Sequence, residues 1–423
     1  MKQVRKGGIA KYTCALVILP TAVACGSSAD TETTTERRAP TTKGAELPND
    51  TAGDTTTNPQ RSPEQWTRPD SAPASPEDES APAPSAPPAS DPGAPAAPAD
   101  PGAAPAEEMS GPVPFRGINL AGAEFGSALP GAFGTDYTFP TRSEVDYYVG
   151  KGMNTFRVGF KWERLQHSAN GDLDATYLGR LDAIVTYATS KGATVILNPH
   201  NFARYYGTTV GSSKVPNGVF ADLWKRLAAK YKANAKVMFN LVNEPHDMGT
   251  EQWVGAANAA IAAIRAEGAN NAIIVPGNGW TGAHSWTSTY YGTPNSKAML
   301  AIEDSKNNHL FEVHQYMDSD SSGGSGECVS TTVGSERLAA FVKWLRDNKK
   351  KGFLGEFAGG NNSTCNAAVK NMLDFVHESS DVLVGWTWWA GGPWWGEYKF
   401  ALDPTSGGKD RPQMALLTPF LKK

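Results

Sequence analysis

Long hydrophobic runs, cysteine and an excess of basic charge are all scarce in this sequence. The formal net charge of the 423 residues is −4, which gives no indication of a nucleic-acid partner. Of the four cysteines, Cys14 and Cys25 lie near the N-terminus, which leaves Cys328 and Cys365 as the only pair in the part expected to fold. A disulfide between those two would suit an exported protein.

Two kinds of ligand site lack their sequence signatures. No glycine-rich phosphate loop follows the first expected strand, which argues against a doubly wound nucleotide-binding sheet. No His-Glu-x-x-His pattern and no cysteine–histidine cluster is present, although His200, His246, His309 and His314 are available. We therefore expect no catalytic metal and no cofactor.

The N-terminus has the pattern of a secretory signal. Basic residues precede an apolar run over Tyr12–Ala24, which is too short to cross a bilayer comfortably. Small residues predict cleavage between Ala24 and Cys25, and the same place resembles a bacterial lipobox, in which the cysteine is lipidated. Ala22 departs from that motif, which usually has leucine there. We predict an exported bacterial lipoprotein whose only membrane contact is the anchor at Cys25. The alternative is a freely secreted product in which Cys25 is only part of the apolar run.

Residues 25–110 differ in composition from the rest of the chain. Thr, Pro, Ala, Ser, Asp and Glu dominate, so this segment cannot bury enough apolar surface to offset its ordering entropy. Its proline-rich second half should be extended and semi-rigid. The expected organisation is a signal peptide over residues 1–24, a disordered stalk over 25–110 and one folded domain over 111–423.

Strand patterns alternate with amphipathic helical patterns from about Pro112 onward. This alternation indicates parallel βαβ units, and eight strands in a domain of this size predict a (β/α)8 barrel, an α/β fold. The expected strands are Phe115–Ala121, Thr155–Phe160, Ala193–His200, Val237–Glu244, Ala272–Asn278, His309–Tyr316, Phe353–Phe357 and Val382–Trp389. The expected helices are Arg142–Lys151, Ala175–Lys191, Asn217–Ala233, Thr250–Glu267, Ser335–Lys350 and Cys365–Glu378.

Polar and aromatic residues stand at the ends of most of these strands. In a barrel of this kind the carboxyl ends of the strands carry the functional groups. Each residue alone could be a core or surface residue, but together they predict one polar, aromatic face. They are Arg157, His200, Asn201, Asn243, Glu244, His314, Tyr316, Glu356, Trp389 and Trp394.

Two glutamates facing one another across a tryptophan-rich cleft are typical of glycoside hydrolysis. One carboxyl must protonate the leaving oxygen, and the other must attack the anomeric carbon or activate water. A glutamate beside Arg157 should be held ionised by that charge and serve as nucleophile. Tryptophan, with twelve copies in this chain, supplies flat faces that stack on sugar rings.

These residues resemble glycoside hydrolase family 5, in the clan that places its glutamates at strands four and seven. The resemblance covers roughly Phe115–Lys423 and is strongest to the fungal-type endo-β-1,4-glucanases and their bacterial relatives. The stretches that support it are Arg116–Gly122, Phe156-Arg157, Pro199–Arg204, Asn243–Asp247, Glu312–Asp320, Gly355–Phe357 and Trp388–Gly396.

The resemblance implies a role for each matched position. Glu244 would be the acid/base and Glu356 the nucleophile of a retaining double displacement. Substrate binding would fall to the remaining strand-end residues: Asn243 on the sugar 2-OH, Arg157 and Tyr316 around the nucleophile, the flanking His200 and His314, Asn201, Trp389 as the sugar platform, and Trp394. Cys328 and Cys365 would join the loops after strands six and seven.

The resemblance also leaves alternatives open. The leading expectation is an endo-β-1,4-glucanase acting on cellulose or β-glucan as a monomer. A β-mannanase or xyloglucanase of the same chemistry would carry the same strand-end residues, because the loops set sugar preference. A non-catalytic glycan-binding protein, or an adhesin in which the stalk matters more than the barrel, would be a different class of protein.

Overall fold

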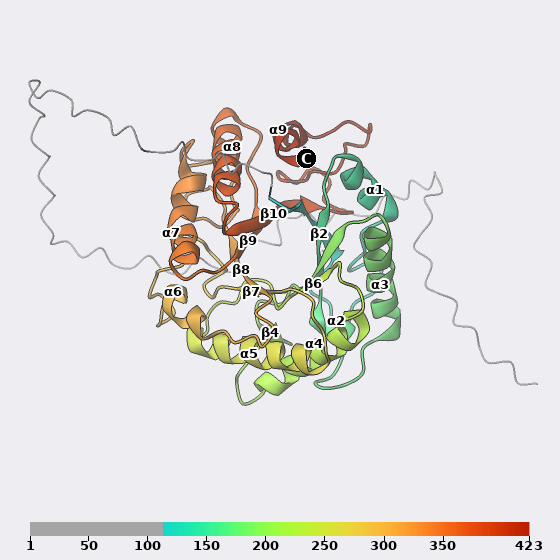
Figure 1. Ribbon diagram of the computed structural model, residues 1–423. Helices are drawn as coiled ribbons and strands as arrows, with labels where there is room; N and C mark the ends of the chain where they lie inside the picture. The colour runs from blue at the N-terminus through green and yellow to red at the C-terminus, as the bar shows by residue number, and fades with distance from the viewer. Residues whose placement is uncertain (1–112, 423) are drawn as a thin grey trace, which may run out of the picture. The chain divides into compact units, whose positions relative to one another are not determined.

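The computed structural model of this chain describes residues 113–422 (Figure 1). The signal peptide predicted over residues 1–24, the stalk over 25–110 and the lipidation of Cys25 lie outside the described residues and stay predictions. Within the described part of the chain, no helix has the length and apolar character needed to span a membrane.

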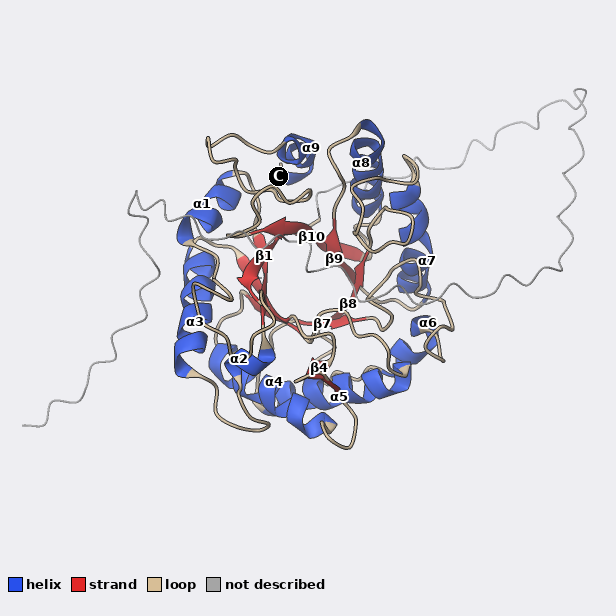
Figure 2. Cartoon of the chain, turned by 180° about the vertical axis from the view of Figure 1, so that it is seen from behind, coloured by secondary structure: helices blue, strands red, loops and turns tan. Residues whose placement is uncertain are grey.

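Eight parallel strands close into a barrel, and helices surround it (Figure 2). Around the ring the strands follow the order β1, β10, β9, β8, β7, β6, β3, β2. Their bounds are β1 Phe115–Ala123, β2 Thr155–Phe160, β3 Thr194–Pro199, β6 Val237–Asn240, β7 Ile273–Pro276, β8 His309–His314, β9 Gly352–Phe357 and β10 Leu383–Gly391. Two short strands, β4 (Arg204–Tyr205) and β5 (Thr208–Thr209), form a separate antiparallel pair. The predicted (β/α)8 barrel is confirmed.

Six helices match the predicted ones to within three residues at each end. They are α1 Arg142–Gly150, α3 Ala175–Ser190, α4 Asn217–Tyr231, α5 Thr250–Ala266, α7 Val333–Asp347 and α8 Ser363–Glu378. Four further helices were not predicted from the sequence: α2 (Trp162–Leu165), α6 (Asn295–Ala298), η2 (Met299–Ala301) and α9 (Pro412–Leu421). The first three are too short to show a helical period. The fourth contains Pro419, which cannot donate a helical hydrogen bond.

Successive strand residues point alternately into the barrel and toward the helices. Ile196 packs inside the barrel, whereas its neighbours Val195 and Leu197 belong to the large core shared with the helices. The interior cluster of buried side chains consists of Ile196, Met238, Ile274 and Phe353, each from a different strand. Because both faces of these strands are buried, the strands read as continuous apolar runs.

The fourth barrel strand, β6, is shorter than predicted. It ends at Asn240, although the apolar run continues through Leu241 and Val242 and both of these side chains are fully buried. The backbone leaves the strand there and reaches Glu244 with φ 43°, a left-handed conformation that no strand can contain. The prediction of a strand over Val237–Glu244 was wrong because burial alone does not distinguish a strand from a buried loop.

The predicted disulfide is present between Cys328 and Cys365. Cys328 lies in the loop after β8, as expected, whereas Cys365 lies in the first turn of α8 rather than in the loop before it. The bond joins positions separated by 37 residues in the sequence, so it holds two segments at the carboxyl ends of neighbouring strands together.

Replacing both cysteines, in Cys328→Ser/Cys365→Ser, should lower the free energy of unfolding by about 3–4 kcal/mol, because the cross-link restricts the unfolded chain. Urea unfolding followed by circular dichroism measures this difference. Reductant should lower the midpoint of the wild type and leave that of the double variant unchanged. Equal midpoints for the two proteins without reductant would contradict the expectation.

Candidate active site

Arg157, in β2, lies at the centre of a buried hydrogen-bond network. Its side chain has no exposed surface, and its guanidinium spreads its donors over several strands. Nη1 donates to Glu356 Oε1 at 2.8 Å, and Nη2 donates to Asn243 Oδ1 at 2.7 Å. Nη1 also donates to Asn119 Oδ1 at 2.8 Å. One cation thereby connects β1, β2, β9 and the segment after β6.

Glu356, near the end of β9, accepts hydrogen bonds on both of its carboxylate oxygens. Besides the bond from Arg157 to Oε1, the hydroxyl of Tyr316 donates to Oε2 at 2.9 Å. Burial raises the pKa of Glu356, while the positive charges of His314 and Arg157 act in the opposite direction. Both direct donors favour the ionised form of this carboxyl.

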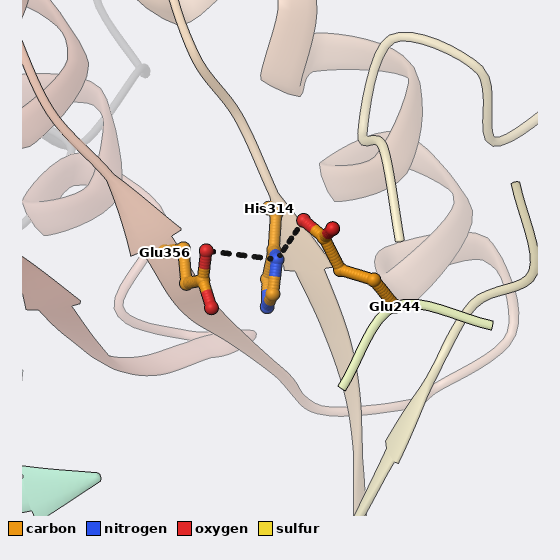
Figure 3. Close-up of side chains that lie close together, drawn as sticks. All are labelled: Glu244, His314 and Glu356. Atoms are coloured by element: carbon orange, nitrogen blue, oxygen red, sulfur yellow. Dashed lines mark hydrogen bonds and ion pairs between the residues drawn. The ribbon is translucent and has the colours of Figure 1, made fainter. Parts of the chain in front are cut away.

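Glu244 approaches Glu356 from the loop after β6, with His314 between them (Figure 3). His314 Nδ1 lies 2.8 Å from Glu244 Oε1 and 3.5 Å from Glu356 Oε2. One oxygen of each glutamate and one ring nitrogen of His314 all lie within 4.8 Å of one another. The two carboxyls are therefore close enough to act on the same bond of a ligand.

The imidazole of His314 is held in its charged form by the carboxylates around it. Burial by itself would lower the pKa, but the charge of Glu356 and the hydrogen bonds to Glu244 and Glu312 outweigh it and raise the pKa to about 9. A protonated ring donates from both nitrogens and has no lone pair for a metal ion. The ring of His314 can therefore donate hydrogen bonds to Glu244 and Glu312 at the same time.

His200, at the end of β3, is in the opposite state. Burial, with the nearby charges of Arg157 and Lys161, lowers its pKa well below the usual value, so the ring is neutral. Its Nε2 lies 3.2 Å from Asn243 Nδ2, which orients the asparagine side chain. The ring of Trp389 lies 5.5 Å from the imidazole, centre to centre.

Two predicted substrate-binding residues lie outside this network. Asn201 accepts from the backbone N–H of Trp162 at 2.8 Å and donates to Glu163 at 2.6 Å, so its amide holds α2 in place. Trp394 is 45% exposed in the loop after β10 and makes none of the polar contacts above. For both residues, contact with a ligand stays a prediction.

A second set of buried polar residues, not predicted from the sequence, lies below the strand ends. Glu312 lies two residues before His314 in β8 and forms an ion pair with Arg157, with Nε 3.1 Å from Oε1. Asn240, the last residue of β6, accepts from Arg157 Nε at 3.1 Å and donates to Glu312 Oε2. The alternation of side chains along a strand would have placed Glu312 on the same face as His314, and that signal was available.

An aromatic series that the sequence analysis also missed continues beyond His200. Phe202 packs edge-on against His200 with ring centres 5.3 Å apart, and it contacts His246 and Trp280 in the same way. The rings of His246 and Trp280 are stacked 3.4 Å apart. From Trp389 through His200 and Phe202 to Trp280, the rings therefore form one continuous series of contacts.

Comparison with known proteins identifies relatives over the whole barrel. The family model for cellulases, glycosyl hydrolase family 5, matches residues 108–392. The endo-beta-1,4-glucanase B of Aspergillus niger is 43% identical over 306 residues, which are 72% of this chain and 89% of that protein. A solved endo-beta-1,4-glucanase of Xanthomonas axonopodis pv. citri is 50% identical with a TM-score of 0.72, covering 73% of this chain and 98% of that one. XacCel5A in complex with cellopentaose is 48% identical, with a TM-score of 0.72, over 73% and 99% of the two chains.

Proposed function

Because this chain belongs to the cellulases of glycosyl hydrolase family 5, we propose that it hydrolyses internal β-1,4-glucosidic bonds of cellulose and β-glucan by a retaining double displacement. The observation that carries the retaining mechanism is the proximity of Glu244 and Glu356, whose nearest oxygens lie within 4.8 Å. Retaining enzymes hold their carboxyls about 5–5.5 Å apart, whereas inverting enzymes leave about 6.5–9.5 Å for a water molecule.

Glu356 is the nucleophile in this proposal. Its direct bonds to Arg157 and Tyr316 favour the carboxylate that must attack the anomeric carbon. The attack forms a glycosyl ester on Glu356 and breaks the glycosidic bond. The electron pair of that bond goes to the leaving oxygen.

Glu244 is the acid and then the base. It protonates the leaving oxygen in the first step, and in the second step it takes a proton from the water that attacks the glycosyl ester. Hydrolysis of the ester returns Glu356 as a carboxylate. His314, hydrogen-bonded to Glu244 Oε1, keeps this carboxyl turned toward Glu356.

Substrate binding in this proposal depends on the residues next to the two glutamates. Asn243, oriented by Arg157 and His200, would bond the sugar 2-OH, and Trp389 would stack on the sugar face. The complex of the related XacCel5A with cellopentaose supports a β-1,4-glucan as the ligand. A β-mannanase or xyloglucanase would use the same residues at the reacting bond.

The proposed localisation of the enzyme rests on its N-terminal sequence and its disulfide. We propose an exported monomer with a signal peptide over residues 1–24, a stalk over 25–110, a catalytic domain over 111–423 and a lipid anchor at Cys25. The disulfide between Cys328 and Cys365 supports an oxidising compartment. With the stalk in between, the barrel would reach polysaccharide at a distance from the cell surface.

The substrate can be tested by reducing-sugar release from carboxymethylcellulose, barley β-glucan, glucomannan and xyloglucan. We expect the highest rates on the first two, together with a sharp fall in viscosity, because internal bonds are cut. The Glu356→Ala variant serves as the blank. Release mainly from glucomannan or xyloglucan would assign a different sugar to the same mechanism.

Replacing the nucleophile, in Glu356→Ala, should lower kcat by about 10⁴-fold or more, as loss of a covalent nucleophile does. Azide should restore turnover of an activated aryl glycoside, because a small anion fits the space left by the carboxylate. The rescued product should have inverted stereochemistry at the anomeric carbon by NMR. Inversion by the wild type, without rescue of the variant, would place the enzyme in the inverting class.

Replacing the acid/base, in Glu244→Ala, should reduce rates by about 10²–10⁴-fold on glucans and much less on aryl glycosides with good leaving groups. An activated leaving group needs little protonation, so bond cleavage survives the loss of the acid. Steady-state kinetics on both kinds of substrate measure the difference. Equal losses on both would refute the assignment of Glu244.

A further inference from the structure

A third carboxyl group, that of Glu312, lies in the barrel interior behind the two glutamates of the proposed reaction. Its side chain is fully buried, and both of its oxygens are engaged. Oε1 lies 3.1 Å from Arg157 Nε and 3.4 Å from His314 Nε2, and Oε2 accepts from Asn240 Nδ2. No substrate group can reach this position, so Glu312 acts only through its neighbours.

The adjoining strand is shaped to leave room for this carboxylate. Gly355 precedes Glu356 in β9, and a Cβ atom at Gly355 would lie 2.0 Å from Glu312 Oε1. Any side chain there would push Glu312 away from Arg157 and His314. Glycine at position 355 is therefore a steric requirement of the Glu312 site.

Charge balance is a second reason why position 312 carries a carboxylate. Arg157 and a protonated His314 place two positive charges on side chains that are almost fully buried, and buried charges are costly unless they are paired. The charge of Arg157 in turn lowers the pKa of Glu312, although burial of the group acts in the opposite direction. Glu312 is thus an ionised partner for both cations.

We propose that Glu312 is a positioning residue of the reaction described above: its carboxylate keeps His314 an imidazolium and orients it together with Arg157. The contacts divide accordingly. His314 turns Nε2 to Glu312 and Nδ1 to Glu244. Arg157 turns Nε to Glu312 and Nη1 to Glu356. One carboxylate thereby aligns the donors that serve both reacting glutamates, and the inference rests on the proposed function of those two.

Several charged and titratable groups face His314, and they act in different directions. Glu356 on β9, Glu244 after β6 and Glu312 on β8 favour the protonated ring. Arg157 on β2 and His200 directly after β3 also interact with the ring, and Arg157 Nη2 is 3.5 Å from His314 Nε2. This nitrogen therefore faces one carboxylate and one guanidinium. Without Glu312, it would be a neutral acceptor for Arg157.

The test replaces the charge with a neutral group of the same shape, in Glu312→Gln of the full chain. We expect kcat to fall by about 10²-fold through misalignment, with little change in KM because no substrate contact is lost. Losing the carboxylate removes the partner of the protonated ring. The pKa of His314, measured by histidine NMR, should therefore fall by about 1–3 pH units.

Asp304→Asn is the matched control. Asp304 is also a covered carboxylate paired with an arginine and a histidine: Arg265 Nε at 2.7 Å and His309 Nδ1 at 3.7 Å. It lies before β8, whereas His314 ends that strand. Asp304→Asn should lower thermal stability and leave both kcat and the pKa of His314 unchanged. A purely structural role for Glu312 would make the two variants behave alike.

Histidine ¹⁵N NMR of the full chain gives a readout independent of turnover. Among the seven histidines, the His314 ring is assigned by its loss in His314→Gln. It should be an imidazolium at pH 7 in the wild type and in Glu312→Asp, which keeps the charge, and neutral in Glu312→Gln. If Glu312→Gln does not fold, Glu312→Asp still decides the question: its shorter side chain draws the carboxylate away from His314 Nε2, so the pKa of His314 should be lower than in the wild type, and an equal pKa would count against the proposal.

A neutral His314 at pH 7 in the wild type would overturn the proposal, as would an unchanged titration in folded Glu312→Gln. These outcomes are distinct from failure of the proposed function, which would appear as a wild type that hydrolyses no β-glucan. Because the NMR titration needs no substrate, it reads the role of Glu312 in either case.

Discussion

The ion pairs of Arg157 are the interaction on which the rest of the site depends. A guanidinium inside a barrel loses its hydration, and that loss is tolerated only if every donor finds an acceptor. Here the acceptors are Glu312, Glu356 and the amide oxygens of three asparagines, contributed by five different segments. The same contacts that neutralise Arg157 therefore fix the position of the glutamate that we assign as nucleophile.

Placing two reacting carboxyls within 4.8 Å of each other carries an electrostatic cost that the surrounding cations offset. Arg157 bonds to one glutamate, and His314 lies between the two. The neutral His200 and the charged His314 show how burial and neighbouring charge move the same side chain in opposite directions.

Several residues in the loops at the carboxyl ends of the strands have an unusual backbone conformation. Glu244, Phe202 and Trp280 all have positive φ, which costs free energy in residues with side chains. Such conformations persist when many contacts in the surrounding structure hold the backbone in place. The closed ring of strands, from which the segments carrying these residues emerge, supplies that rigidity.

The sequence by itself determined the barrel, most helix bounds and the residue types at the strand ends. Apolar runs, helical periods and the Asn-Glu-Pro and Gly-Glu-Phe stretches are local patterns, and local patterns can be read without coordinates.

The tertiary structure alone decided which of these residues meet. Arg157 and Glu356 are 199 positions apart, and only strand register and barrel closure bring them to 2.8 Å. For the same reason the sequence did not reveal that Glu312 pairs with Arg157 or that Asn201 bonds to α2. It also did not reveal that β6 ends before its apolar run does. Contacts between distant strands depend on packing, which no local pattern records.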